Sequence, residues 1–324
     1  MDRFCFGFAF EPHIWRSHKY HLGYEAFQSW LQGFTNADQI REPGLLTSGF
    51  CTLCIAASLA EFLSAYPTVI HIGTATAIFE IDGINFLTDP FFSPAGTTWD
   101  MGGGNVLKNT ETPALALENL PPIDAILLSH EDHPDNLDEL GRRLLDGRHV
   151  FTTMDGANNL APRPAVRGME PWKTVPVVLG GKQFEITATP CQHLPGGECT
   201  GFIITSKEFG VAADGKPNAI YFTGDTVYID ELAKIPEKFH VVCAVMNLGS
   251  AFAGLPDGPL QITMDGKQAA HLFRTIKADY LVPMHYESWG HFTQFGKDLV
   301  KVFEEESIMD KVRWLSPGKS VKVQ

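Results

Sequence analysis

The chain has 324 residues, 44% hydrophobic and 19% charged, which supports a large buried core and excludes a disordered polymer. Its 38 acidic and 25 basic side chains give a formal net charge of -13. That negative field argues against nucleic acid or an anionic membrane as the main partner, and leaves a small-molecule substrate as the expectation.

Residues 1–66 differ from the rest of the chain, because clustered aromatic and histidine residues replace regular strand patterns there. We expect an N-terminal extension that is either helical or poorly ordered. Cys51 and Cys54 lie in an apolar run over residues 44–60, where packing is a better interpretation than metal or redox chemistry. The run is too short to span a bilayer and lies too deep in the chain for a simple signal peptide. We therefore expect a reduced, cytoplasmic protein without a membrane span, and the sequence sets no oligomeric state.

From Pro67 onward strand and helix signals alternate. Asp82-Gly83 and Gly180-Gly181 lie between β-branched and aromatic runs, which predicts hairpins over residues 76–88 and 175–189. A third strand pair is predicted between residues 202–205 and 219–222. Short apolar runs typical of buried strands occupy residues 125–128, 241–246 and 280–282.

Three helices are predicted between these strands. Residues 269–276 carry apolar side chains with the spacing of one buried helix face, and residues 292–306 repeat that pattern. A shorter helix is predicted over residues 137–145 and closed by Gly147. Hairpins mixed with strand–helix units indicate an α/β protein with two sheets inside layers of helices, over residues 67–324.

Polar side chains follow four of the predicted strands, at the point where each strand ends. They are His130 with the segment up to Asn136, then His193, Asp225 and His285. If these strand ends share one edge of the sheets, the side chains converge on one point. Imidazoles and carboxylates gathered away from water require a compensating cation. Nitrogen and oxygen ligands without thiolate favour Zn²⁺, with Mn²⁺ or Fe²⁺ as alternatives, in a site for one or two ions.

These motifs resemble the metallo-β-lactamase superfamily over residues 68 to about 320. The matching elements are His71-Ile72-Gly73, Leu87-Thr88-Asp89-Pro90, Ser129-His130 through Leu137-Asp138, His193, Thr223-Gly224-Asp225 and Pro283-Met284-His285. The chain is most similar to the branch of L-ascorbate-6-phosphate lactonase and N-acylphosphatidylethanolamine phospholipase D, and to its fungal members. The resemblance implies a four-layer αββα sandwich.

The resemblance also implies a ligand set. His130, His133 and His193 would hold a first ion, whereas Asp135 and His285 would hold a second one. Asp225 would bridge both ions, and Asp135 would also orient the nucleophile or accept its proton.

The motif departs from the family pattern HxHxDH, because this chain has HxxHxDN. A one-residue insertion after His130 restores the register and keeps Asp135 in the aspartate position. Without the insertion, Asp132 would take the second ligand position and Asp135 the last. The insertion puts Asn136 where the family has its final motif histidine, and the alignment without it puts Asp135 there, so the second site has a weaker ligand set in either case. One tightly bound ion with a labile second ion is the resulting hypothesis.

Further residues are expected around these ligands. His71 and Asp89 would orient a ligand imidazole, although a purely structural role fits His71 equally well. Tyr286, Trp289 and His291 would contact or protonate the substrate, with packing at the rim as an equal alternative. Gly102-Gly103-Gly104 is expected to form a loop near the site mouth.

The predicted function is that of a metal-dependent hydrolase. A metal-bound hydroxide would cleave an ester-like bond of a small molecule, namely a lactone, phosphodiester, thioester or amide. One alternative is a mononuclear iron oxygenase with the same fold. The other is a non-catalytic metal-binding protein with a degenerate second site.

Overall fold

A computed structural model describes residues 66–102, 106–256 and 258–324. They belong to the second of the chain's two compact units, Ala56–Gln324. The predicted extension over residues 1–65 and its Cys51–Cys54 pair lie outside the described residues. None of the described helices is long and apolar enough to cross a membrane.

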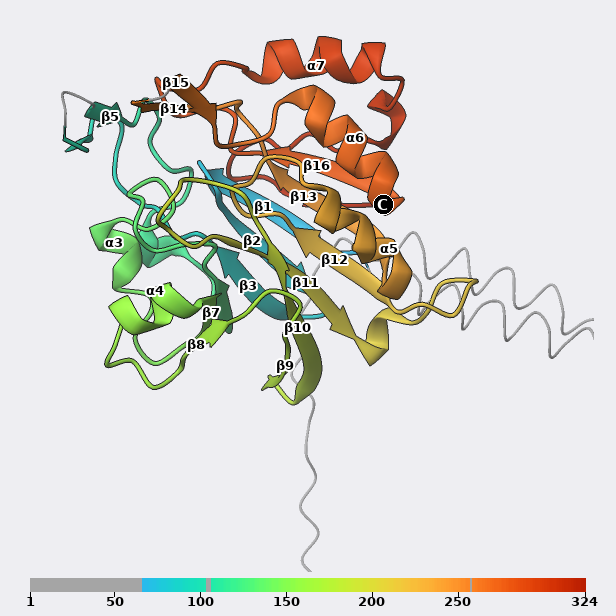
Figure 1. Ribbon diagram of the computed structural model, residues 1–324. Helices are drawn as coiled ribbons and strands as arrows, with labels where there is room; N and C mark the ends of the chain where they lie inside the picture. The colour runs from blue at the N-terminus through green and yellow to red at the C-terminus, as the bar shows by residue number, and fades with distance from the viewer. Residues whose placement is uncertain (1–65, 103–105, 257) are drawn as a thin grey trace, which may run out of the picture. The chain divides into compact units, whose positions relative to one another are not determined.

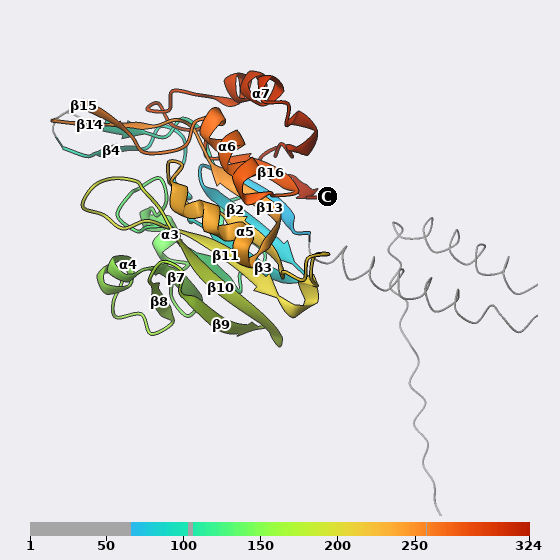
Figure 2. The same cartoon turned by 45° about the vertical axis from the view of Figure 1, so that its right-hand side comes forward.

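Two packed sheets form the centre of this unit (Figures 1 and 2). The seven-stranded sheet has the order β17 (Ser320–Lys322), β1 (Thr68–Gly73), β2 (Thr76–Ile81), β3 (Ile84–Thr88), β6 (Ala125–Leu127), β7 (His149–Thr153) and β8 (Val166–Met169). The six-stranded sheet has the order β16 (Tyr280–Met284), β13 (His240–Asn247), β12 (Asn218–Phe222), β11 (Thr200–Ser206), β10 (Lys182–Pro190) and β9 (Thr174–Leu179). The three predicted strand pairs are confirmed as β2–β3, β9–β10 and β11–β12.

The main core lies between the two sheets and is rich in phenylalanine. Phe79 of β2 packs edge-on against Phe222 of β12, and Phe86 of β3 packs against Phe184 of β10, with ring centroids 6.1 and 5.2 Å apart. Burial of these large rings stabilises the sandwich and fixes one sheet against the other.

Helices cover the outer faces of both sheets, which gives the predicted αββα layering (Figure 1). The six-stranded sheet carries α5 (Ile235–Lys238), α6 (Gly266–Ile276) and α7 (Gly296–Glu305), and the seven-stranded sheet carries α3 (Glu139–Arg142) and α4 (Met154–Asn159). Four 3₁₀ turns occupy Leu117–Asn119, Lys207–Phe209, Asp230–Lys234 and Met309–Lys311.

Two predicted helices are shorter than expected. The helix α3 spans only Glu139–Arg142, because Asp138 caps its first turn by accepting from the Gly141 N–H and turns follow Arg142. The helix α7 begins at Gly296, because Phe292 belongs to a preceding turn and packs on the His285 ring, with centroids 4.9 Å apart. Apolar spacing alone did not distinguish this residue from the helix face.

Several strands deliver their carboxyl ends to the same edge of the sandwich. Strands β12, β13 and β16 are parallel, and β10 runs in the same direction because two antiparallel pairings separate it from β12. Two small hairpins lie at this edge, β4 (Thr98–Asp100) with β5 (Val106–Lys108) and β14 (Phe252–Leu255) with β15 (Gly258–Gln261). Both views show the two hairpins side by side (Figures 1 and 2).

Candidate metal centre

Three imidazoles meet at this edge of the sandwich. His130 and His133 follow β6, and His193 follows β10. The His133 Nδ1 lies 3.1 Å from the His130 Nε2 and 3.2 Å from the His193 Nε2. Three ring nitrogens therefore point at a common centre, as ligands of one ion do. We call these residues the histidine group.

Hydrogen bonds on the far side of two rings fix their orientation. The His193 Nδ1 donates to the Ile262 carbonyl at 2.8 Å. Since a carbonyl only accepts, the neutral His193 ring must carry its proton on Nδ1, which leaves the Nε2 lone pair facing the centre. The His130 Nδ1 lies 2.9 Å from the Ser129 Oγ. Such partners commonly orient histidines that bind metals.

Burial favours the neutral form of two imidazoles in the histidine group. Burial lowers the pKa of His130 well below its usual value, and the neighbouring imidazoles of His133 and His193 lower it further. Burial also lowers the pKa of His193, against the opposing effect of Asp225. Neutral imidazoles keep the lone pairs that a cation needs.

A second group combines two carboxylates with one imidazole, all three buried. The His285 Nε2 lies 3.5 Å from the Asp135 Oδ2 and 3.4 Å from the Asp225 Oδ2. The Asn247 side chain, at the end of β13, donates to the Asp225 Oδ1 at 2.7 Å and fixes that carboxylate. We call Asp135, Asp225 and His285 the mixed group.

In the mixed group, the imidazole and the carboxylates stabilise one another in their charged forms. Burial alone would lower the pKa of His285, but the Asp225 and Asp135 carboxylates outweigh it and raise the pKa to about 10. Burial would likewise raise the pKa of Asp135, but the contact with His285 brings it well below its usual value. Two carboxylates buried this closely require a positive charge between them.

The residues present fit metal binding. Within each group the ligand atoms lie within 4.8 Å of one another. The His285 Nε2 faces the two carboxylates at 3.4 and 3.5 Å, distances longer than those of good hydrogen bonds, so there is room for an ion to take the place of its proton. Three nitrogens in one group, and two oxygens with one nitrogen in the other, suit Zn²⁺ or a similar divalent ion.

The positions of Asp132 and Asn136 bear on the two alignments of the motif. Asp132 is exposed and lies outside both groups, with its carboxylate beside Gly197. Asn136 is buried, and its side-chain amide donates to the Asp89 Oδ2 at 3.1 Å. This is the arrangement expected from the alignment with one inserted residue, in which His133 and Asp135 are the ligands.

Asp89 forms a buried support behind the histidine group. It accepts from the Ser129 N–H at 2.6 Å and from the Ser129 hydroxyl at 2.8 Å, and so connects to His130. Burial and the nearby Asp225 raise the pKa of Asp89 to about 8. The sequence reading missed Ser129 and Asn247, although both stand at strand ends as the predicted ligands do.

His71 lies farther from the ligands. Its Nε2 is 3.0 Å from the Thr74 carbonyl, and the Thr74 hydroxyl donates to the Asp135 carbonyl at 3.3 Å. His71 and Tyr286 line another cavity, of about 380 Å³, whose lining also includes His285. His71 therefore supports the backbone near Asp135 through Thr74, and its hydrogen bond within the described residues goes to a backbone carbonyl and not to a ligand imidazole.

A cavity of about 300 Å³ opens above the two groups, and His133, Asp135, His193, Asp225 and His285 line it. His291 also lines it, as predicted for a substrate contact. Trp289 and Tyr286 do not: Trp289 is buried against Phe91 and Trp99, and the Tyr286 ring packs against Trp314. For these two, the alternative of structural packing describes their positions.

The loop predicted near the site mouth falls only partly within the described residues. Gly103 and Gly104 lie outside the described residues, but Met101 and Val106 on either side of them line the cavity. Cys191 and Cys199 lie behind the ligands, and the Cys199 thiol donates to the Asp225 carbonyl at 3.1 Å. The described donor groups include neither cysteine.

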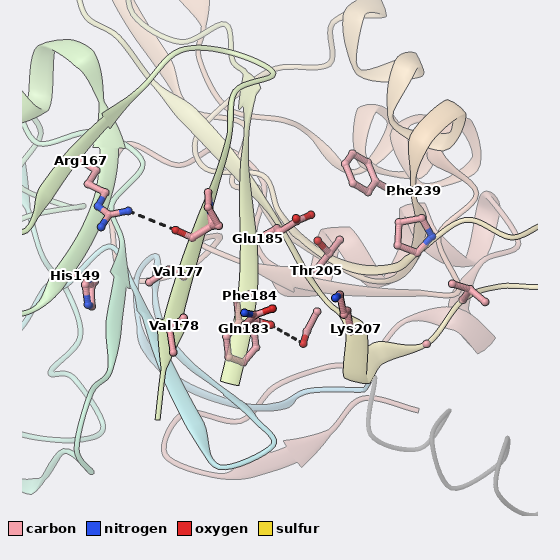
Figure 3. Close-up of a pocket in the computed structure, with 15 residues that line it drawn as sticks. His149, Arg167, Val177, Val178, Gln183, Phe184, Glu185, Thr205, Lys207 and Phe239 are labelled. Atoms are coloured by element: carbon pink, nitrogen blue, oxygen red, sulfur yellow. Dashed lines mark hydrogen bonds between the residues drawn. The ribbon is translucent and has the colours of Figure 1, made fainter. Parts of the chain in front are cut away.

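A larger cavity lies elsewhere. It has a volume of about 760 Å³ and lies beside β9, β10 and Arg167 of β8 (Figure 3). None of the proposed metal ligands lines it. Size alone therefore does not identify the functional site, whereas the gathering of titratable side chains does.

Comparison with known proteins agrees with this geometry. The beta-lactamase superfamily domain matches residues 84–286. A metal-dependent hydrolase of Methanopyrus kandleri is 26% identical over 254 residues, which cover 77% of this chain and 96% of that protein.

Two solved structures share the fold. One is isothiocyanate hydrolase from Delia radicum gut bacteria, with a TM-score of 0.63 and 22% identity over 78% of this chain and 98% of that one. The other is a metallo hydrolase from Ignicoccus hospitalis, with a TM-score of 0.57 and 22% identity over 80% and 99% of the respective chains. The chain therefore belongs to the beta-lactamase superfamily and is a metal-dependent hydrolase of that superfamily.

Proposed function

We propose that this hydrolase cleaves an ester-like bond of a small molecule at the centre formed by the two donor groups. His130, His133 and His193 would hold one ion, Asp135 and His285 would hold a second, and Asp225 would be shared. The observation that carries the proposal is the convergence of both groups at the floor of one cavity of about 300 Å³. When bound, the ions would activate water and polarise the bond to be cleaved.

The protein's own groups supply orientation and proton transfer. Asp135 is ionised, because its pKa lies well below its usual value, so its carboxylate is able to accept a hydrogen bond from the attacking water. Asp225 is held in place by the amide of Asn247. Asp135 and Asp225 are therefore the proposed catalytic carboxylates.

His291 is the proposed contact to the leaving group. It lines the cavity, and its Nδ1 has no hydrogen-bond partner among the described residues. Burial lowers the pKa of His291, against the opposing effect of Asp135. A neutral imidazole at this position offers one N–H to a departing oxygen and positions it.

The bond that the protein cleaves is proposed to be a lactone, a phosphodiester, a thioester or an amide. The resemblance to the lactonase and phospholipase D branch favours a lactone or a phosphodiester over a thioester or an amide, although the fold does not determine the substrate. Zn²⁺ is the proposed ion because nitrogen and carboxylate oxygen are its usual ligands at catalytic sites, and Mn²⁺ or Fe²⁺ would use the same donors.

The test uses the full chain, purified without chelator and assayed on p-nitrophenyl butyrate and bis(p-nitrophenyl) phosphate. Assays with and without added Zn²⁺ or Mn²⁺ should show turnover that depends on the metal and is lost in Asp225→Ala. Turnover coupled to oxygen consumption would instead identify an iron oxygenase. No turnover with any metal would favour a metal-binding protein without catalysis.

A further inference from the structure

The cavity above the two donor groups has a polar floor and apolar walls. Every titratable side chain among the described residues that line it belongs to the floor: five of the six proposed ligands, all but His130, together with His291. The walls come from the β4–β5 and β14–β15 hairpins and from neighbouring loops, and their main side chains are Met101, Val106, Leu107, Phe252, Leu255 and Phe292.

The walls offer almost no polar contact to a ligand. Among the described residues that line the cavity, none is Lys or Arg. Apart from the floor, the polar side chain of the lining is Thr263, which is buried and whose hydroxyl accepts from the Ala251 N–H at 2.9 Å. A charged or strongly polar group placed against these walls would lose its hydration without gaining a partner.

The apolar walls extend to the surface of the protein. Met101, Val106 and Phe252 are 44%, 59% and 43% exposed, although all three are large apolar side chains. They lie at the rim of the same cavity, on the two hairpins that run side by side in Figures 1 and 2. Exposed apolar groups that cluster around a concave site commonly mark where an apolar ligand binds.

The hairpins are anchored, so the walls are already formed before a ligand arrives. Trp99 of β4 packs against Trp289 and Phe91, with ring centroids 5.6 and 5.7 Å apart. Leu107 of β5 and Ala253 of β14 pack on the same aromatic cluster. A preformed apolar pocket loses little entropy when it binds its ligand.

From these observations we infer that the substrate carries a compact, uncharged apolar group beside the bond that is cleaved, and that the two hairpins bind this group. The inference rests on the proposed function, because it places the reacting bond at the donor groups. The cavity volume of about 300 Å³ is at the lower end for ligand pockets, so the apolar group is small. A distal phosphate or carboxylate would be desolvated against the same walls, which disfavours substrates that carry one.

The experiment compares p-nitrophenyl esters of increasing acyl length on the metal-loaded full chain. From acetate to pentanoate, kcat/KM should rise about three- to fourfold per added methylene until the cavity is filled. The mono-p-nitrophenyl ester of glutaric acid matches the pentanoate in length but ends in a carboxylate. Its kcat/KM should be at least about tenfold lower than that of the pentanoate, because the carboxylate would be desolvated.

Phe252→Ala tests the hairpin itself. It should reduce the gain per methylene to about twofold or less, because it removes part of the wall. Val178→Ala is the matched control, since Val178 is an apolar side chain that is 58% exposed and lines the other large cavity. The control should keep the dependence on acyl length of the unmodified protein.

A binding measurement separates this inference from the proposed function. Alkyl hydroxamates chelate metal ions, so their affinity for the metal-loaded protein should rise with alkyl length even if no ester is hydrolysed. A rise without turnover would overturn the proposed function but would still support binding of an apolar group by the two hairpins. Equal affinities across the alkyl series, or a preference for the glutarate ester, would overturn the inference. It would also fail if Phe252→Ala weakened binding to phosphatidylcholine vesicles but left the dependence on acyl length unchanged.

Discussion

The histidine group and the mixed group differ in the charge of their buried imidazoles. In the histidine group, burial keeps the imidazoles of His130 and His193 neutral, so their lone pairs face one another without any positive charge. In the mixed group, the carboxylates of Asp135 and Asp225 hold a proton on His285, whose pKa is raised to about 10. His130 and His193 thus add no positive charge to the histidine group, whereas protonated His285 supplies one in the mixed group.

This difference indicates how ions should bind. A metal entering the histidine group displaces little or no proton near neutral pH, but a metal entering the mixed group must displace the proton of His285. The mixed group also lacks the fourth side chain that the family pattern would supply at Asn136, which instead donates to Asp89. We therefore expect the histidine group to bind its ion more tightly.

The largest expected effect comes from removing a ligand of the histidine group. His130→Ala should lower metal affinity and kcat/KM by more than about 100-fold, since even residues that only orient ligands contribute 10- to 100-fold. His271→Ala is the control, because His271 is an exposed histidine of α6. Metal analysis and esterase assays measure both effects. A His130→Ala protein with its full metal content would disprove the assignment.

The pH dependence should distinguish the two groups. The pKa of His285 is raised to about 10, so this imidazole is protonated at neutral pH in the metal-free protein. Affinity of the mixed group should then increase about tenfold per pH unit from pH 7 toward 10, as one proton is displaced. The histidine group should show little change over that range. Titrations against a chromophoric chelator at several pH values measure this, and equal slopes for both ions would contradict the comparison.

A smaller effect is expected from the support behind His130. Asp89→Asn keeps the shape of the side chain but removes one of the acceptors for Ser129 and Asn136. Metal affinity should fall about tenfold. Asp124→Asn provides the control, because Asp124 accepts from the Asn85 N–H at 2.8 Å before the start of β6, away from the strand ends that carry the ligands. Equal losses in the two variants would show that Asp89 acts only on stability.

The smallest effect tests the alignment of the motif. Asp132 is exposed and outside both donor groups, so Asp132→Asn should leave the number of bound ions and the activity unchanged. Asp135→Asn, by contrast, should remove the ion of the mixed group. Metal content per chain decides between the two alignments, and a loss of metal in Asp132→Asn would favour the alignment without an insertion.

The hairpins and the position of the donor groups could be predicted from the sequence, because short local motifs specify them. Asp82-Gly83 fixed a hairpin turn, and strand ends followed by His130, Asp225 and His285 indicated one common edge. The cavity walls were not predicted, because the β4–β5 and β14–β15 strands are only three or four residues long. Their apolar side chains face a cavity and one another, and these strands are too short for the alternation of apolar and polar residues that predicts a strand. Both alternatives stayed open for Trp289 for a similar reason: a tryptophan next to a ligand looks the same in sequence whether it lines a site or packs beneath it.

Element-resolved metal analysis of the full chain, purified without chelator and then dialysed against a mild chelator, tests the central claim most directly. The account predicts close to one divalent ion per chain after dialysis, and up to two after Zn²⁺ is restored at alkaline pH. A chain that stays free of metal under both conditions, or that keeps two ions throughout, would contradict it.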